Sequence, residues 1–282
     1  MVFFERDIAI DMGTACTLLY VNGKGISLRE PTVVAVDRQT GRLLKVGEEA
    51  QKMLGRTPAN IVAIHPIASG VISDYDMASE MMKDLISRVT SFGFFKLCVV
   101  ICVPSSITGV EERATIDAAI AAGARRVYLL EKAVAVAMGA GLDISKPDGH
   151  MVIDIGAGTT EIAVVSLGGV VECESIKFAG NEFDEAIIKF IRRKHNLLIG
   201  SRTAEELKQN IGCVFPTDEV TYQDVKGRCL MTGLPRTATI SSTDMIEALE
   251  EPSDRILETL HMVLERTPPE LVSDISENGI VM

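Results

Sequence analysis

Two short segments of the chain combine an aspartate with glycines and hydroxyl side chains between apolar runs. The first, IDMGTACT, contains Asp11 and Gly13, and the second, IDIGAGTT, contains Asp154 and Gly156. Backbone N–H groups in a glycine-containing turn can converge on one point, and such a concavity binds anions, phosphate oxygens above all. A preceding aspartate suits a hydrated Mg²⁺, which prefers carboxylate, water and phosphate oxygens. Each segment therefore has the residue types of a phosphate-binding turn.

The two segments belong to a longer internal repeat with an offset of 143 positions. At this offset Thr17 aligns with Thr160 and Gly25 aligns with Gly168, and the flanking apolar residues align as well. A single Asp-x-Gly turn is usually an ordinary hairpin, but the pair favours a duplicated domain. Two such turns that face each other would hold a triphosphate in the cleft between the duplicated halves.

Strand-like and helix-like segments alternate along the chain, which predicts an α/β fold with a largely parallel sheet. Hairpins are expected at 7–23 and 32–47, and the apolar run at 96–105 predicts a buried strand. Apolar spacing predicts helices at 78–89, 110–124, 133–142, 181–195, 203–211, 243–250, 253–266 and 269–277. Pro252 suits the first turn of the helix that follows it.

Length and composition restrict the class of protein. The chain has 282 residues, of which 47% are hydrophobic, and its formal net charge is -11. The length suits two domains, and the acidic balance argues against nucleic acid as a partner. No apolar run reaches the length of roughly 18 residues that a membrane-spanning helix needs. With no signal peptide in the sequence, we expect the chain in the cytoplasm.

Several longer stretches carry a resemblance to a known family. EPTVVAVD, VPSSITGVEERATIDAA and NLLIGSRTAEELKQNIG, together with the two turns, resemble the MreB group of bacterial actin-like proteins over essentially the whole chain. The resemblance implies an actin-like ATPase fold, in which two RNase H-like domains surround a nucleotide cleft. Domain I would span 1–143 with a small subdomain at about 31–74, and domain II would span 144–282 with a small subdomain at about 181–242.

The resemblance also implies cofactors and site residues, with ATP and Mg²⁺ in the cleft. The first phosphate loop would comprise Gly13, Thr14, Ala15 and Cys16. The second would comprise Gly156, Ala157, Gly158, Thr159 and Thr160. Asp11 and Asp154 would hold the metal through water, and Glu205 and Lys208 would lie near the adenosine.

In function, the family implies head-to-tail filaments that associate with the membrane, guide the cell-wall elongation machinery and maintain rod shape. The expected location is therefore the cytoplasm, at the inner face of the cell membrane. Two apolar segments, MVFFE at the start and FGFF at 92–95, are candidates for contact with that membrane.

The two loops each depart from the family pattern at one position. The first loop has Cys16 where the family has asparagine, which exchanges an amide for a weak S–H donor and weakens one phosphate contact. The second loop has Ala157 where the family has glycine. A methyl group is tolerated there unless the backbone requires a positive φ.

A third departure concerns catalysis, since the sequence reads EKA where the family reads EEP. Lys132 stands at the position of the glutamate that is expected to orient the attacking water, and a charged lysine accepts no proton. Its side chain would either face the phosphates or turn away toward Glu131 or solvent. Both alternatives predict impaired hydrolysis, so no residue is assigned as catalytic.

The fourth departure is at the C-terminal end. The family continues beyond the GIVM that ends at Met282 with a loop under the adenine and a closing helix, so we expect the last part of the fold to be missing. Two other functions remain open. One is a small-molecule kinase of the same superfamily, and the other is a non-polymerising, degenerate or regulatory relative.

Overall fold

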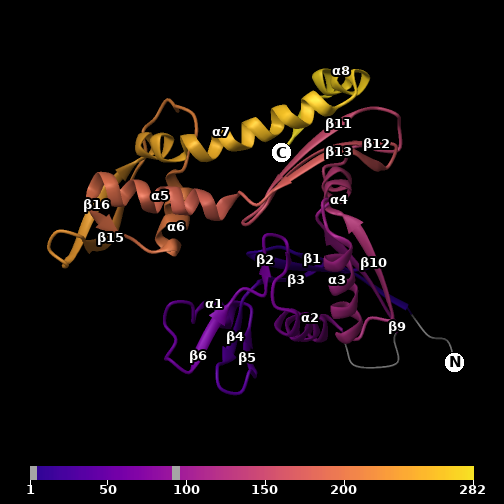
Figure 1. Ribbon diagram of the computed structural model, residues 1–282, viewed down its shortest axis with the longest axis horizontal. Coiled ribbons are helices and arrows are strands. Elements are labelled where there is room, and N and C mark those ends of the chain that lie inside the picture. The colour runs from indigo at the N-terminus through magenta and orange to yellow at the C-terminus, as the bar shows by residue number, and fades with distance from the viewer. Residues whose placement is uncertain (1–4, 91–95) are drawn as a thin grey trace. The chain divides into compact units, whose positions relative to one another are not determined.

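The computed structural model describes residues 5–90 and 96–282. Contacts divide the chain into two compact units, one formed by Met1–Lys177 with Arg266–Met282 and the other by Phe178–Glu265 (Figure 1). The domain boundary that the resemblance implies, between 143 and 144, lies inside the first unit and stays a prediction. The apolar residues 1–4 and 92–95, considered above for membrane contact, lie outside the described residues.

The first unit contains a five-stranded sheet with the order β10-β9-β1-β2-β3. Its strands are β1 (Glu5–Met12), β2 (Cys16–Val21), β3 (Gly25–Pro31), β9 (Lys96–Val103) and β10 (Arg126–Glu131). Strands β1, β2 and β3 form an antiparallel meander, whereas β9 runs parallel to β1 and β10 parallel to β9. Helices α2 (Tyr75–Val89) and α3 (Gly109–Ala121) contribute to the same hydrophobic core as this sheet. Ile8, Ile101 and Leu85 are buried in that core.

A second sheet of the same unit repeats this arrangement in the order β13-β12-β11-β17. Its strands are β11 (His150–Ile155), β12 (Thr160–Ser166), β13 (Gly169–Ile176) and β17 (Ile280–Val281). Again three consecutive strands form an antiparallel meander and a later strand, β17, pairs parallel to the first. Gly25 and Gly168, aligned by the repeat, both have positive φ, at 80° and 74°. The predicted duplication is therefore present in strand order, in strand direction and in backbone conformation.

Both sheets are mixed, and the predicted largely parallel sheet was wrong. The reason is the short turns, because strands joined by a few residues must pair antiparallel. Parallel pairing occurs where helices intervene, as between β1 and β9. Helix α4 (Lys132–Gly139) packs on the second sheet through Ala133 and Ala137, and α8 (Pro269–Asn278) lies close to β11.

A small three-stranded sheet lies within the predicted small subdomain at 31–74. The sheet has the order β5-β4-β6 and consists of β4 (Val34–Asp37), β5 (Leu43–Val46) and β6 (Ile61–Ile64). The same segment contains helix α1 (Glu48–Gln51) and two short paired strands, β7 (Ile67–Ala68) and β8 (Val71–Ile72). The antiparallel β4–β5 pair confirms the hairpin predicted at 32–47. Val33, Ala35 and Ala50 form its own buried cluster.

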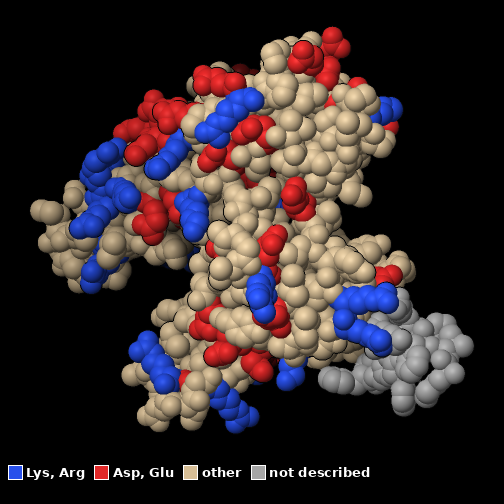
Figure 2. All heavy atoms as spheres, turned by 45° about the vertical axis from the view of Figure 1, so that its right-hand side comes forward, with Lys and Arg blue, Asp and Glu red and all other residues tan. Residues whose placement is uncertain are grey.

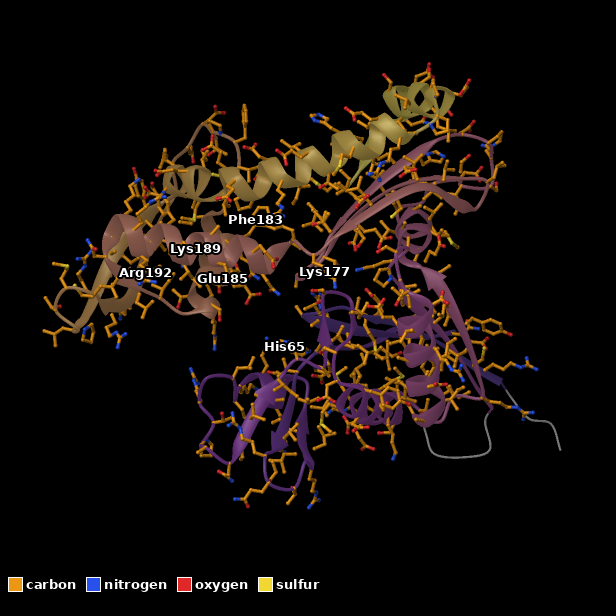
Figure 3. All side chains as sticks on the ribbon, in the orientation of Figure 1. His65, Lys177, Phe183, Glu185, Lys189 and Arg192 are labelled. Atoms are coloured by element: carbon orange, nitrogen blue, oxygen red, sulfur yellow. The ribbon has the colours of Figure 1, made fainter. Side chains whose placement is uncertain are left out.

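The second unit contains the helices α5 (Gly180–His195), α6 (Ser201–Ile211) and α7 (Ser242–Arg266). The last residue of α7 belongs to the first unit. The strands of the second unit are β14 (Leu197–Leu198), β15 (Tyr222–Cys229) and β16 (Pro235–Ser241). The strands pair in the order β14-β15-β16. Ile187 and Ile191 on the buried face of α5 pack with Leu207 of α6. Glu185, Lys189 and Arg192 project from another face of α5 and are exposed (Figure 3), as the 3.6-residue period requires.

Helix α7 corrects a prediction. The helices expected at 243–250 and 253–266 are one continuous helix with Pro252 inside it. Pro252 is buried, and the Ser253 hydroxyl donates a hydrogen bond to the Leu249 carbonyl oxygen at 2.7 Å. Burial of one apolar face through Leu249, Ile256 and Val263 outweighs the local preference of proline for a helix start.

The surface carries charges of both signs. Figure 2 shows acidic and basic side chains interspersed over the face drawn, and basic residues form no continuous stripe on that face. Among the described residues, no helix has both the length and the apolar character needed to cross a bilayer.

Candidate functional site

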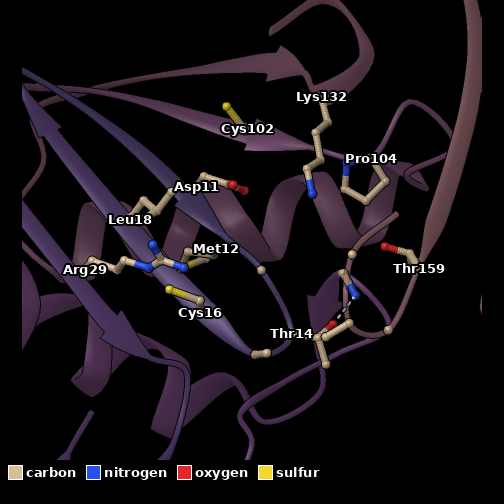
Figure 4. A pocket seen from close by; sticks show the side chains of 16 residues that line it. Asp11, Met12, Thr14, Cys16, Leu18, Arg29, Cys102, Pro104, Lys132 and Thr159 are labelled. Atoms are coloured by element: carbon tan, nitrogen blue, oxygen red, sulfur yellow. Dashed lines mark hydrogen bonds between the residues drawn. The ribbon is translucent and has the colours of Figure 1, made fainter. Parts of the chain in front are cut away.

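The two glycine-containing turns line one pocket with a volume of about 190 Å³ (Figure 4). The first turn (residues 13–16) joins β1 to β2, and the second turn (residues 156–159) joins β11 to β12. Asp11, Met12, Leu18, Arg29, Gly70, Cys102, Pro104 and Lys132 complete the lining. The predicted convergence of the two turns on one cavity is therefore present in the structure.

The two turns have the same internal hydrogen bond. The Gly13 N–H donates to the Cys16 carbonyl oxygen at 3.0 Å, and the Gly156 N–H donates to the Thr159 carbonyl oxygen at 2.9 Å. A Cβ atom on Gly13 would lie 2.8 Å from that Cys16 oxygen, and one on Gly156 would lie 3.2 Å from the Thr159 oxygen. A side chain at Gly13 would clash with its own turn, and one at Gly156 would make a tight contact, because each turn closes closely on itself.

The turns also touch each other, at Thr14 and Gly158. A Cβ atom on Gly158 would lie 2.7 Å from Thr14 Oγ1. The same Oγ1 accepts a hydrogen bond from the Gly70 N–H at 3.1 Å. Thr14 thus links the second turn to the loop between β7 and β8, and the absence of a side chain at Gly158 sets how closely the turns approach.

The charged residues that line the pocket are Asp11, Arg29 and Lys132, and Asp154 lies beside them as the ion-pair partner of Lys132. Lys132 Nζ lies 2.7 Å from Asp154 Oδ2, and Lys132 and Asp11 both extend into the pocket in Figure 4. Burial raises the pKa of the Asp11 carboxyl, while the nearby Lys132 ammonium acts in the opposite direction. Burial alone would lower the pKa of Lys132, but attraction to Asp11 and Asp154 outweighs it and the pKa is raised. Lys132 therefore stays charged at neutral pH.

The position of Lys132 resolves the two alternatives that the sequence left open. The side chain lines the pocket rather than turning to Glu131 or solvent. The pair predicted to hold a hydrated Mg²⁺, Asp11 and Asp154, is thus already faced by a monovalent cation that belongs to the chain. The described residues contain no group of three or more histidine, cysteine or acidic side chains arranged for a metal. With the ammonium in this position, the Asp154 carboxylate does not fit a divalent cation as well, because two cations at one carboxylate repel each other.

Glu161 is a buried acid of the site that sequence reasoning did not single out. It lies on β12 with an exposed fraction of 4%. The Ser105 hydroxyl donates to its Oε1 at 2.7 Å and the Ser105 N–H donates to its Oε2 at 3.3 Å. Burial raises the pKa of this carboxyl, and the Ser105 hydrogen bonds oppose the shift. The sequence could have pointed to Glu161 because it is an acidic residue within the apolar run TEIAVVS. An acid in such a run is expected to be buried, and a buried carboxylate requires a partner.

The two positions at which the loops depart from the family pattern are Ala157 and Cys16. Ala157 is not among the described non-glycine residues with positive φ, which are Ser69, Leu167 and Asn196, so its methyl group causes no backbone strain. Cys16 lines the pocket, and its thiol makes only a weak contact of 3.9 Å with the Thr17 carbonyl oxygen.

The remaining predicted site residues are Thr160, Glu205 and Lys208. Thr160 is completely buried at the start of β12 and does not line the pocket. Lys208, on α6 of the second unit, forms an ion pair with Asp184 at 2.8 Å and donates to the Gly180 carbonyl oxygen. Glu205 lies on the same helix and is exposed. The roles of Glu205 and Lys208 near an adenosine stay predictions.

Comparisons with known proteins agree with this architecture. The family model described as MreB/Mbl protein matches residues 5–282. The cell shape-determining protein Mbl of Bacillus cereus is 49% identical over 280 residues, which covers 99% of this chain and 84% of the relative. The crystal structure of MreB5 of Spiroplasma citri bound to AMPPNP superimposes with a TM-score of 0.94 at 38% identity, and the match covers 99% of this chain and 84% of that one.

A more distant structure, the MamK double helical filament, shares the fold alone. Its TM-score is 0.79 at 22% identity, with 95% of this chain and 82% of the MamK chain covered. The duplicated sheets are thus those of the actin-like fold that the resemblance implied, and the chain belongs to the MreB/Mbl family.

Proposed function

We propose that this chain binds ATP in the pocket and forms filaments that maintain rod cell shape. The observation that carries the proposal is the pair of equivalent turns, which meet at Thr14 and Gly158 around one cavity. Two relatives support it, because MreB5 of Spiroplasma citri has been solved with AMPPNP and Mbl of Bacillus cereus is named as cell shape-determining.

In this proposal the phosphate oxygens accept hydrogen bonds from backbone N–H groups of the two turns and from their threonine hydroxyls. Converging N–H groups bind anions without any basic side chain, which suits a chain with a net charge of -11. Glu205 and Lys208 would contribute to the nucleoside part of the site.

Hydrolysis by this chain is impaired, in our proposal, because the pocket lacks a base at residue 132. The Lys132 ammonium carries three donors and no acceptor. It is also held by Asp154 at 2.7 Å, so that carboxylate is partly neutralised. General-base assistance typically contributes about 10²–10⁴-fold to a rate, and this contribution would be lost.

Filament formation, membrane association and guidance of wall synthesis extend the proposal to the cell. Support comes from the family and from the MamK filament, whose subunit has the same fold. In the same proposal the chain works at the inner face of the cytoplasmic membrane with the cell-wall elongation machinery as partner.

A non-polymerising regulatory relative is a second candidate function, and Lys132 is compatible with it because such a relative could bind ATP without hydrolysing it. A small-molecule kinase is disfavoured because such an enzyme needs a base for the hydroxyl of its substrate. The carboxylate of Asp154 is paired with Lys132 and Glu161 is hydrogen-bonded to Ser105, so of these acids and Asp11 only Asp11 could serve as that base.

Calorimetric titration with ATP tests the binding site. Gly158→Ala would place a methyl group against Thr14 Oγ1, so we expect the affinity for ATP to fall by at least about tenfold. Gly169→Ala is the matched control, because a Cβ atom there meets nothing within 4 Å. Equal ATP affinities of these two variants would contradict the proposed site.

Sedimentation in the presence of ATP separates the two candidate functions. A filament-forming protein enters the pellet with ATP and stays in the supernatant without it. The Gly158→Ala variant should remain in the supernatant. A wild-type chain that binds ATP but never sediments would support the regulatory relative instead.

A further inference from the structure

We propose that the ammonium group of Lys132 takes the place of the divalent cation, so that this chain binds ATP without Mg²⁺. The inference rests on the proposed ATP site and adds to it the form of nucleotide that is bound. The reason for the inference is that Asp154, predicted to hold Mg²⁺ together with Asp11, is instead paired with the Lys132 ammonium.

Geometry is the first argument. Lys132 Nζ lies 2.7 Å from Asp154 Oδ2 and lines the same pocket as Asp11 and the two turns. The ammonium therefore occupies the acidic end of the cavity in which phosphate oxygens would lie. An ammonium has three N–H donors, so one can bind Asp154 while the others point at phosphate oxygens.

Charge is the second argument. Asp11, Asp154, Arg29 and Lys132 together carry a formal charge of 0. A glutamate at position 132 would make this charge -2, and a bound Mg²⁺ would return it to 0. Exchanging glutamate for lysine thus supplies the same two units of positive charge as the metal. Mg²⁺ added beside Lys132 would place a second cation at the same Asp154 carboxylate, where the two cations would repel each other.

Local helix structure gives the third argument. Lys132 is the first residue of α4, where the aligned peptide dipoles place partial positive charge and disfavour a cation. The helix dipole therefore does not explain why a lysine stands at the first position of α4. The two carboxylates of the pocket do account for it, since they hold the ammonium against the helix dipole. The side chain of Lys132 is only 21% exposed, so solvent screens these interactions weakly.

The test measures the affinity of the full chain for ATP by calorimetry, once in excess Mg²⁺ and once in excess EDTA. For the wild type we expect dissociation constants that agree within about threefold between the two conditions. For Lys132→Glu we expect ATP binding to weaken by at least about tenfold in EDTA and to recover with Mg²⁺. For Lys132→Met, which removes the charge without adding an acid, we expect weaker binding in EDTA only.

The matched control is Lys24→Glu, which makes the same change of charge in the exposed turn between β2 and β3. It should behave as the wild type does in both conditions. If Lys132→Glu does not fold, as judged by circular dichroism, Lys132→Met and the wild type still decide the question.

Wild-type binding that falls tenfold or more in EDTA overturns the inference while leaving the ATP site intact. Absence of ATP binding by the wild type in both conditions overturns the proposed function and this inference together.

Discussion

Burial changes the acid–base behaviour of several individual side chains around the pocket. It raises the pKa of the carboxyl groups of Asp11 and Glu161 and the pKa of the Cys102 thiol, the last to about 11. In each case the charged form loses hydration on leaving water. Lys132 differs because its acidic neighbours stabilise the charged form. A stable ammonium thus lies close to groups whose charged forms burial makes less favourable than in water.

Cys102 gives a direct chemical test of this environment. Only the thiolate is alkylated, and a pKa of about 11 leaves little thiolate at pH 8. We expect iodoacetamide to modify Cys102 at pH 8 about a hundredfold more slowly in the folded chain than in the unfolded chain. The rate should rise with pH toward 11, because deprotonation supplies the reactive form.

Peptide mass spectrometry after timed alkylation measures this rate, with the chain in denaturant as control. Cys173, whose pKa burial raises to about 12, should be protected as well. Labelling of Cys102 at the denatured rate would show that the wall of the pocket is open to solvent.

At the scale of elements, helix α7 contains a proline that weakens it locally. Pro252 lacks the N–H that would bond to the residue one turn earlier, and proline inside a helix is about 3 kcal/mol less favourable in helix propensity than alanine. Pro252→Ala also loses some buried apolar surface, worth roughly 1 kcal/mol. We therefore expect the substitution to stabilise α7 by about 1–2 kcal/mol.

Hydrogen exchange of peptides from α7 measures the effect without assuming that the whole chain unfolds in one step. Exchange should slow by roughly tenfold around residue 252. Glu251→Ala, at the exposed neighbouring position, is the control and should change exchange little. Faster exchange in Pro252→Ala would mean that packing of the proline ring outweighs the missing hydrogen bond.

The elements that the sequence predicted well are those with local signals. The two turns could be predicted because the pairs of glycine and aspartate recur at one offset, and the structure gives both turns the same closing hydrogen bond. The first hairpin is confirmed by the antiparallel pairing of β1 with β2. Helix α7 was predicted as two helices because the rule for proline is local, whereas burial of its apolar face depends on the rest of the second unit.

Contacts between distant segments could not be predicted in the same way. The sequence raised the question of Lys132, but its pairing with Asp154 depends on the start of α4 meeting the end of β11. Likewise Ser105 and Glu161 lie far apart in the chain and meet only when the segment after β9 reaches β12. These pairs determine the electrostatics of the pocket, and their geometry follows from tertiary structure alone.

For the whole molecule, slow hydrolysis should make assemblies long-lived. With Lys132 in place of a base, we expect wild-type filaments to persist after ATP is added and to release little phosphate. Lys132→Glu, in excess Mg²⁺, should release phosphate at least about tenfold faster, because a carboxylate can orient and deprotonate water. Light scattering follows the assemblies and a colorimetric assay follows phosphate. Equal phosphate release by the two proteins would contradict this account of position 132.

The second unit leaves the first after Lys177 and returns to it at Arg266. Arg266 Nη1 lies 2.8 Å from Glu174 Oε2 on β13, so the outgoing and returning segments are neighbours. Segments whose two ends are adjacent are the ones that a domain can lose or exchange without rearranging its own core. Residues 178–265 thus form an insertion whose two ends lie side by side, so a short peptide would be long enough to join Lys177 to Arg266.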